Sequence, residues 1–173
     1  ATPSDSPTPR VGTAAYRLAK LTWQPDPAWR ATASYTRDPY EIDNYNAAWY
    51  VAPEATEHWS QGGTLVSASA QGVLTPRLLW QAQAGRQRSH VDYFPQGGDF
   101  TALRRENWGD DLLFSGNAAG EQFSDRDRDV VATSLEWLPS GRAGHHDVKA
   151  GLELSRRMFN GARCATGTAT NAP

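Results

Sequence analysis

Cysteine and methionine are almost absent from this chain, which has one of each in 173 residues. The single cysteine, Cys164, excludes an internal disulfide and a cysteine-rich metal site. Long hydrophobic runs are also missing, because the longest, such as VLTPRLLW, extend over only a few residues. A membrane helix needs about 20 apolar residues. A spanning α-helix is therefore excluded, and β-strands remain as the way in which this chain could cross a bilayer.

Neither sign of charge is in excess, because 17 basic and 19 acidic side chains leave a formal net charge of -2. The charge favours no particular partner, and we expect no nucleic-acid binding. The chain does contain 15 glycines and 11 prolines. This composition favours turns and strands over a helical bundle.

Catalytic and metal-binding motifs are missing too: the sequence has no G-x-S-x-G, H-E-x-x-H, Walker loop or C-x-x-C. The HH pair at 145 and 146 has no third ligand nearby and is interpreted as part of a solvated turn. DRDRD at 125 to 129 lacks the glycine and the terminal glutamate of a calcium loop, so we interpret it as the hydrated base of a strand. GDD at 109 to 111 is short enough to occur by chance. We therefore predict no enzyme activity, no cofactor and no metal.

Alternation of apolar and polar residues predicts six strands in three hairpins. The clearest run is WRATASYT at 29 to 36, in which Trp29, Ala31, Ala33 and Tyr35 alternate with polar residues. The other five runs are AYRLAKLTW, TLVSASAQGVL, RLLWQAQAGRQ, DVVATSLEW and DVKAGLELS.

The connections between these runs alternate between short and long. The hairpins close through QPDPA, TP and LPSGRAGHH, whereas the segments at 37 to 62 and 88 to 128 are long. Long loops are uncommon in compact soluble domains, but transmembrane β-barrels join their strands by short periplasmic turns and long outer loops. We predict an all-β fold: an antiparallel up-and-down meander of about six strands that forms part of a transmembrane β-barrel, open in this chain, with long outer loops.

Charged residues within the strands test this prediction. Lys20, Arg30, Glu136, Lys149 and Glu153 all have the polar parity, which would face a wet lumen. Two arginines have the apolar parity. Arg86 lies near the loop end of its strand, where it can snorkel to the headgroups, whereas Arg17 is the residue that fits least well.

Tryptophans mark one end of the predicted strands. Trp23, Trp29 and Trp137 lie beside short turns on the apolar parity, where a membrane-interface girdle places aromatic rings. The alternative interpretation is that these tryptophans pack the core of a soluble β-sandwich.

Two segments resemble the barrel of TonB-dependent outer-membrane receptors of the Oar-like branch. They are AKLTWQPDPAWRATASYTRDP and DRDRDVVATSLEWLPSGRAGHHDVKAGLELSRRMF, in which a KLTW strand, a short turn and an H-[DE]-[VF]-K-x-G-[LV]-E strand recur. The resemblance covers about half of the chain. It implies an interior piece of a barrel of about 22 strands, located in the outer membrane of a Gram-negative bacterium. The implied partners are outer-membrane lipid, an extracellular solute, and the TonB energy-coupling complex acting through a plug region that is not seen here.

The long loops are rich in aromatic residues, which supply contact area for ligands. We predict weak ligand contacts from six of them: Trp49, Tyr50, Trp59, Tyr93, Phe94 and Trp108. Packing of the loops against one another is the alternative role. The solute itself is not indicated by the sequence.

The two ends of the chain suggest that residues 1 to 173 are one fragment of a longer barrel domain. We expect residues 1 to 14 to be a loop or disordered, and residues 156 to 173 to begin a further outer loop. Cys164 would lie in that loop, either as a free thiol or paired with a cysteine outside this sequence. Two other functions remain open: a porin or adhesion-type barrel, and a soluble secreted β-sandwich that binds a ligand.

Overall fold

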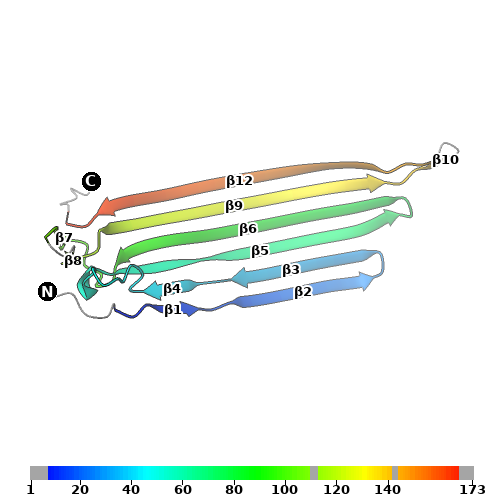
Figure 1. Cartoon of the computed structure of the whole chain (residues 1–173). Coiled ribbons are helices and arrows are strands. Elements are labelled where there is room, and N and C mark those ends of the chain that lie inside the picture. The colour runs from blue at the N-terminus through cyan, green and yellow to red at the C-terminus, as the bar shows by residue number, and fades with distance from the viewer. Residues whose placement is uncertain (1–7, 110–112, 142–143, 168–173) are drawn as a thin grey trace.

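The computed structural model describes residues 8–109, 113–141 and 144–167. Its main feature is one antiparallel sheet, in which six long strands follow one another in chain order (Figure 1). These strands are β2 (Arg17–Asp26), β3 (Trp29–Arg37), β5 (Glu57–Thr75), β6 (Leu78–Pro95), β9 (Gly120–Trp137) and β12 (Val148–Ala165). The predicted all-β antiparallel meander is confirmed, and the sheet is open.

Shorter elements complete the described chain. Strand β1 (Val11–Ala14) pairs with β4 (Tyr40–Asp43), which in turn pairs with the start of β5. A single 3-10 turn, η1 (Pro53–Ala55), precedes β5. Two small ribbons lie apart from the main sheet: β7 (Arg105–Asn107) with β8 (Leu113–Ser115), and β10 (Ser140–Gly141) with β11 (Gly144–His145).

Pro39 interrupts what would otherwise be one strand from β3 into β4. The interruption stays hydrogen-bonded, because the Asp38 amide donates to the Gly63 carbonyl at 3.2 Å and the Ala15 amide donates to the Pro39 carbonyl at 3.1 Å. A side chain at Gly62 would place its Cβ 2.8 Å from the Pro39 Cα. Glycine is therefore required where β5 passes this kink.

The strands extend further toward the loops than the sequence predicts. β5 begins at Glu57, β6 continues to Pro95 and β9 begins at Gly120, so much of the predicted loops at 37 to 62 and 88 to 128 is paired backbone. β12 likewise continues to Ala165, where a loop was expected from residue 156. β1 occupies part of the segment expected to be loop or disordered. The extensions carry polar residues on both faces, which removes the alternation that predicts a strand.

Register pairing sorts the long strands into two faces. One face, called the apolar face below, contains the aligned row Leu21, Ala33, Ala68, Ala84, Val131, Leu154. The other, the polar face, contains the aligned row Thr22, Thr32, Ser69, Gln83, Ala132, Glu153. Residues directly opposite one another share a face of the sheet. The positions predicted to be apolar in each of the six strands therefore all lie on one face.

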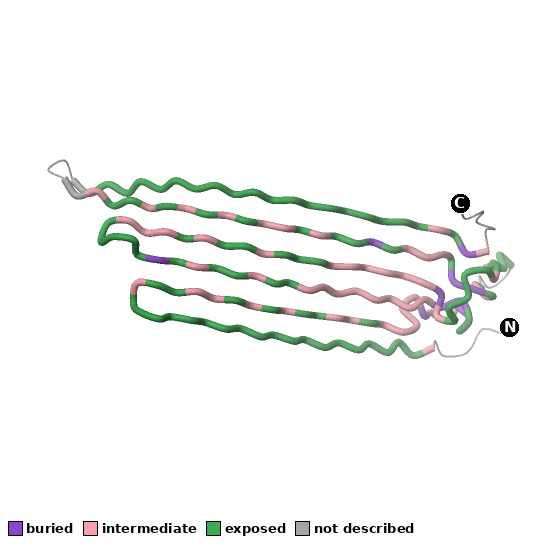
Figure 2. Tube along the Cα trace, turned by 180° about the vertical axis from the view of Figure 1, so that it is seen from behind, coloured by how far each residue is buried: buried purple, intermediate pink, exposed green. Residues whose placement is uncertain are grey.

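The main sheet has no second layer over it among the described residues. The accessible surface is 12215 Å², compared with about 8,400 Å² for a compact protein of this mass. The buried apolar residues are small and lie at the loop end (Figure 2): Ala47, Val51, Ala52, Ala55 and Ala118. The strands therefore expose both faces, including large apolar side chains such as Leu21 and Leu154.

The two ends of the sheet differ. The short turns and the β10–β11 ribbon lie at one end, whereas η1 and the β7–β8 ribbon lie at the other (Figure 1). The latter is called the loop end below, and the former the turn end. No helix in the described part of the chain is long and apolar enough to cross a membrane.

Candidate functional site

Four aromatic rings gather on the polar face at the loop end. Trp59 and Tyr93 are opposite one another in β5 and β6, and their rings stack with centroids 5.8 Å apart and an interplanar angle of 2°. Tyr45 lies against both, at 4.7 Å from Trp59 and 5.6 Å from Tyr93. Tyr40 meets the edge of Trp59 at 5.9 Å. These four residues are called the aromatic cluster below.

Asparagine side chains hold Tyr45 in place. Asn46 Oδ1 accepts a hydrogen bond from the Glu57 amide at 2.8 Å, and the Tyr45 amide donates to the Glu57 carbonyl at 2.7 Å. Asn44 adopts a left-handed conformation with φ 57°, which asparagine tolerates well. Its Oδ1 accepts a hydrogen bond from the Thr56 hydroxyl at 2.9 Å. The loop after β4 is thereby tied to the start of β5, so the cluster is largely preformed.

Charged groups surround the aromatic cluster. Glu57 has the same parity as Trp59, and burial raises the pKa of its carboxyl, while the nearby charges of Arg104 and Arg163 act in the opposite direction. Burial, together with Tyr45 and Glu57, also raises the pKa of Tyr93. The Tyr93 phenol therefore stays neutral at ordinary pH and is able to donate a hydrogen bond.

One donor in the cluster is unused. The indole Nε1 of Trp59 is buried and has no hydrogen-bond partner among the described residues. Buried polar groups normally find a partner.

A second group of aromatic residues joins the loops to each other. Tyr50 meets Trp49 at 5.4 Å and Phe114 at 5.8 Å, and the Arg104 guanidinium lies 4.0 Å from the Phe114 ring centroid. Backbone hydrogen bonds support the contact, since the Phe114 amide donates to the Tyr50 carbonyl at 2.8 Å. This group packs loop against loop.

A cluster of polar side chains lies on the apolar face at the loop end. His58 Nδ1 and Asp43 Oδ1 are 2.7 Å apart, and the Gln96 side-chain amide donates to the same oxygen at 3.0 Å. These hydrogen bonds, from Gln96 first and then His58, lower the pKa of Asp43. The Phe94 ring lies 4.7 Å from the His58 ring. Phe94 therefore faces away from its neighbour Tyr93.

The structure divides the six predicted ligand-contact residues among separate places. Trp59 and Tyr93 belong to the aromatic cluster, Trp49 and Tyr50 to the loop-packing group, and Phe94 to the opposite face. Trp108 follows β7 and is 75% exposed, and it has no ring contact with another described residue. The prediction omitted Tyr40 and Tyr45. The alternation of Tyr40 and Ile42 after Pro39 is the signal that indicates Tyr40.

The three predicted girdle tryptophans lie on the apolar face toward the turn end and are exposed: Trp23 63%, Trp29 39% and Trp137 52%. Trp29 packs across Gly72, where a Cβ would lie 2.6 Å from its ring. Its ring centroid is 6.1 Å from that of Trp80. Trp80 thus belongs with the predicted girdle residues, although its position further from a turn did not suggest it.

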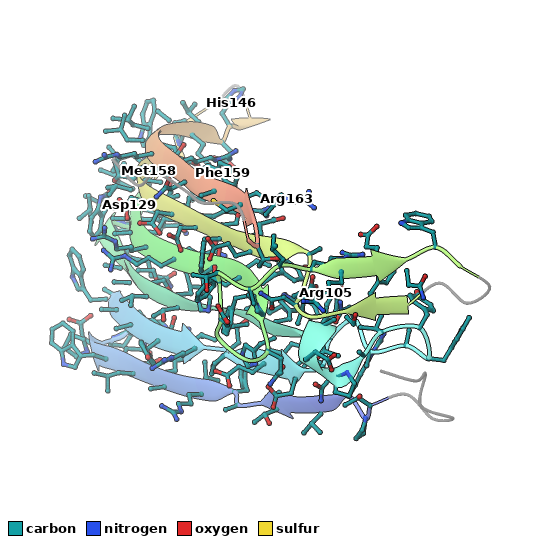
Figure 3. The ribbon with its side chains drawn as sticks, turned by 90° about the vertical axis from the view of Figure 1, so that its left-hand side faces the viewer. Arg105, Asp129, His146, Met158, Phe159 and Arg163 are labelled. Atoms are coloured by element: carbon teal, nitrogen blue, oxygen red, sulfur yellow. The ribbon has the colours of Figure 1, made fainter. Side chains whose placement is uncertain are left out.

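The segment DRDRD places its acidic side chains on one face of the sheet and its basic side chains on the other. Asp125, Asp127 and Asp129 have the apolar-face parity, and Arg126 and Arg128 the polar-face parity. Figure 3 shows the two faces from the loop end, with Asp129 and Met158 on one side and Phe159 and Arg163 toward the other. The expectation that this motif lies at the base of a strand was wrong, because β9 begins five residues earlier, at Gly120. The motif instead lies inside β9, where charged side chains take the place of apolar ones on the apolar face.

Arg17 is one member of a row of polar residues. It pairs in register with Arg37, and the row continues through Thr64, Arg88 and Asp127. Arg88 Nε lies 3.8 Å from Asp127 Oδ2, and Arg86 Nε lies 3.3 Å from Asp129 Oδ1. Three arginines of the apolar face, Arg17, Arg37 and Arg88, therefore lie in one row, and Arg86 lies two residues away from it along β6.

The remaining sequence features yield little chemistry. The described residues contain no group of three or more His, Cys, Asp or Glu side chains arranged to hold a metal. Of the HH pair, His145 belongs to β11. Asp110 and Asp111 of GDD lie outside the described residues. Cys164 is a half-buried free thiol within β12, opposite Glu121, and not in a loop.

Comparison with known proteins leaves the family open. No protein-family model matches this chain, and no curated protein matches it.

Proposed function

We propose that this chain is part of the barrel of an outer-membrane receptor that binds an extracellular solute and imports it with energy from a TonB complex. The apolar face meets lipid, the polar face lines the lumen, and the loop end faces the outside of the cell. The energy coupling is proposed on the resemblance of the two hairpin segments alone.

The observation that supports a membrane location is the uncovered apolar face. On β3 it extends over the nine residues from Trp29 to Arg37, and the steps between them make about 27 Å along the strand. A strand tilted by 35–45° makes that about 19–22 Å of height, near the ~25 Å apolar band of a membrane barrel. Tryptophans mark one limit of the band and arginines the other, as interfacial anchors do. A soluble monomer rarely exposes an apolar patch of this extent.

The edges of the sheet support a larger barrel. β12 is 18 residues long and, in the described part of the chain, pairs only with β9; β2 pairs only with β3. Long exposed edges invite pairing with other chains. Further strands in a closed barrel would occupy both edges and satisfy their backbone groups.

The aromatic cluster is our candidate for solute contact. It lies on the proposed lumen face at its outer entrance, Trp59 and Tyr93 are stacked there, and hydrogen bonds of Asn44 and Asn46 hold the loop that carries Tyr45. Stacked rings bind planar or carbohydrate-like surfaces at low entropic cost. Trp59→Ala should weaken solute binding, whereas Trp108→Ala, at an exposed position outside the aromatic cluster, should leave it unchanged. Equal loss in both variants would reject the cluster as the contact site.

Two alternatives remain distinguishable. A porin or adhesion-type barrel would share the sheet but would lack a plug domain in the complete gene. A soluble β-sandwich would need a second sheet over the apolar face.

The test of the proposal uses the protein encoded by the complete gene. It should remain folded only in detergent or lipid, and a monodisperse monomer in plain buffer would overturn the membrane location. In intact cells, a maleimide added outside should label a cysteine at Asn46 and miss one at Asp26, with Cys164 replaced by serine in both. Labelling of Asp26 alone would reverse the proposed orientation.

A further inference from the structure

We infer that the polar face holds a binding site for a solute that has a phosphate monoester group and a hydroxylated body. Three arginines of β9 and β12, namely Arg126, Arg128 and Arg157, would hold the phosphate, and an uncharged hollow beside Arg128 would hold the body. These three residues are called the arginine triad below. The inference rests on the proposed function, because it assigns a substrate class to the proposed lumen.

The triad follows from the alternation of aspartate and arginine in β9. Successive side chains of a strand point to opposite faces, so the two kinds of charge in DRDRD cannot neutralise one another. On the apolar face, two arginines of β6 form ion pairs with Asp127 and Asp129. On the polar face, no carboxylate oxygen of a described residue lies within 4.0 Å of any arginine of the triad. The acidic charge of the segment is therefore paired, and its basic charge is not.

The arginines of the triad lie close to one another. Arg128 and Arg157 are directly opposite in register, which places their Cβ atoms about 5 Å apart. Arg126 lies two residues from Arg128 along β9, or about 7 Å. Like charges directly opposite one another destabilise a sheet. An anion bound between the guanidinium groups would remove this repulsion.

The number of converging charges favours a phosphate monoester over a carboxylate. A guanidinium group forms two parallel hydrogen bonds with either anion. A phosphate monoester carries a charge of about -1.5 to -2 at pH 7 and has three acceptor oxygens, whereas one carboxylate carries a single charge on two oxygens. Three guanidinium groups around one point can all be used by a phosphate.

The hollow beside the triad has a volume of about 380 Å³. Arg128 is the one charged residue in its described lining, which also includes Ser67, Gln83 and Gln87. Gly85 leaves the floor open, because a Cβ there would have no atom closer than 3.7 Å. Hydroxyl and carboxamide groups both donate and accept hydrogen bonds, as the hydroxyls of a sugar do. The hollow therefore suits an uncharged hydroxylated body.

The two parts of the site are continuous. Arg128 belongs to the triad and also lines the hollow, and Gln87 lies directly opposite Arg128 in the register of β6 and β9. Neighbouring strands are about 4.8 Å apart. One small molecule can therefore place its phosphate on the triad and its body over Gly85.

The triad lies inward of the aromatic cluster. Arg128 shares a register row with Leu65, which is six residues from Trp59 along β5, or about 20 Å. Arg163 shares the row of Trp59 and lies on the same side of β12 as Phe159 (Figure 3). Basic side chains thus extend from the proposed outer entrance toward the triad. Such a series raises the local concentration of an anion.

The experiment uses the full-length protein in detergent, after its detergent requirement has been tested separately. Glucose 6-phosphate is the probe, and its binding is measured by isothermal titration calorimetry. Glucose lacks the phosphate, inorganic phosphate lacks the body, and citrate supplies several carboxylates without a phosphate. We expect one glucose 6-phosphate per protein, bound at least about tenfold more tightly than each of the other three compounds.

Four variants separate the parts of the site. Arg128→Gln and Arg157→Gln should each weaken binding of glucose 6-phosphate and inorganic phosphate by about tenfold or more. Arg156→Gln is the matched control, because this adjacent arginine of β12 lies on the apolar face, and it should leave binding unchanged. Gly85→Leu fills the hollow, so it should weaken binding of glucose 6-phosphate and leave that of inorganic phosphate unchanged.

A second measurement tests whether another part of the full-length protein already neutralises the triad. Without a ligand, Arg157→Gln should raise the midpoint of urea unfolding, because it removes a like charge opposite Arg128. A lower midpoint would show that a carboxylate elsewhere in the full-length protein pairs with Arg157. The triad would then have a structural role, and the inference would be overturned.

Three binding results would also overturn the inference. Citrate bound as tightly as glucose 6-phosphate would contradict a phosphate site, and equal affinity for inorganic phosphate and glucose 6-phosphate would exclude the hollow. Unchanged binding in both Arg128→Gln and Arg157→Gln would exclude the triad. Folding in plain buffer would instead reject the proposed membrane location, and the titrations would then be made in that buffer. A protein that folds only in detergent and binds no glucose 6-phosphate would overturn this inference alone.

Discussion

The indole Nε1 of Trp80 donates a hydrogen bond to the Thr133 hydroxyl oxygen at 3.1 Å, and that hydroxyl donates in turn to the Gln81 carbonyl at 3.1 Å. Trp80 and Thr133 both lie on the apolar face. Two polar side-chain groups on a face otherwise dominated by alanine, leucine and valine thus satisfy one another. In lipid, where water is absent, unpaired groups would each carry a free-energy cost.

Replacing Thr133 with valine should therefore destabilise the protein. The change keeps the side-chain shape but leaves the Trp80 N–H without an acceptor, which costs about 1–3 kcal/mol when the donor is buried from water. Urea unfolding of the full-length protein from lipid bilayers measures this. In a Trp80→Phe background, where no N–H needs a partner, Thr133→Val should cost much less. Equal costs in the two backgrounds would show that the hydrogen bond contributes nothing.

Neighbouring residues of β3 should respond oppositely to a new charge. Ala33→Arg places a guanidinium on the apolar face near mid-strand, at a cost of about 2–4 kcal/mol in a membrane. Thr32→Arg, on the polar face, enters the proposed watery lumen and should cost little. The free energy of unfolding from bilayers compares the two variants directly. A larger loss for Thr32→Arg would mean that the faces are assigned the wrong way round.

Gly72 should be needed for the position of Trp29. A Cβ at residue 72 would lie 2.6 Å from the Trp29 ring, so Gly72→Val must displace the indole from the strand and from Trp80. We expect a blue or red shift in the Trp29 emission of a variant in which the other tryptophans are phenylalanine, together with a lower unfolding midpoint. Gly85→Val is the matched control, because its Cβ would have no atom closer than 3.7 Å. Similar spectra for both variants would contradict the packing.

The meander could be predicted because one face of each strand is apolar and the other polar, as in the run from Trp29 to Tyr35. Such alternation specifies strand, face and register together. The continuation of β9 through Gly120–Asp129 was not predictable in this way, because aspartate and arginine alternate there and neither face is apolar. Backbone pairing extends the strand without a signal in hydrophobicity.

The aromatic cluster was also only partly predictable from the sequence. Trp59 and Tyr93 were recognised as candidates, but their stacking depends on the pairing of β5 with β6, which brings together residues far apart in the chain. Tyr45 reaches them only because hydrogen bonds to Asn44, Asn46 and Glu57 shape the loop after β4. Phe94, adjacent to Tyr93 in sequence, lies on the opposite face because side chains alternate along a strand.

Acidification should release the loop after β4 from the sheet. The Asp43 carboxylate accepts hydrogen bonds from Gln96 and His58, which lower its pKa. A lowered folded-state pKa means that ionised Asp43 stabilises the docked loop at pH values above the unfolded-state pKa, about 3.9. The stabilisation falls as the pH drops below that value and is lost once the pH passes the lower folded-state pKa.

A nitroxide spin label on Glu54→Cys, in a Cys164→Ser background, reports the mobility of the loop at any pH. We expect an immobilised spectrum at pH 6 that becomes mobile below about pH 4, the range set by the aspartate carboxyl. Asp43→Asn cannot ionise, so its spectrum should be more mobile at pH 6 and should change little on acidification. Asp99 also has a lowered pKa, from the Thr101 backbone and side chain, so Asp99→Asn serves as the control and should retain the transition. If the transition disappears in Asp99→Asn and persists in Asp43→Asn, the pH response belongs to the turn at Asp99 and not to the His58–Asp43 pair.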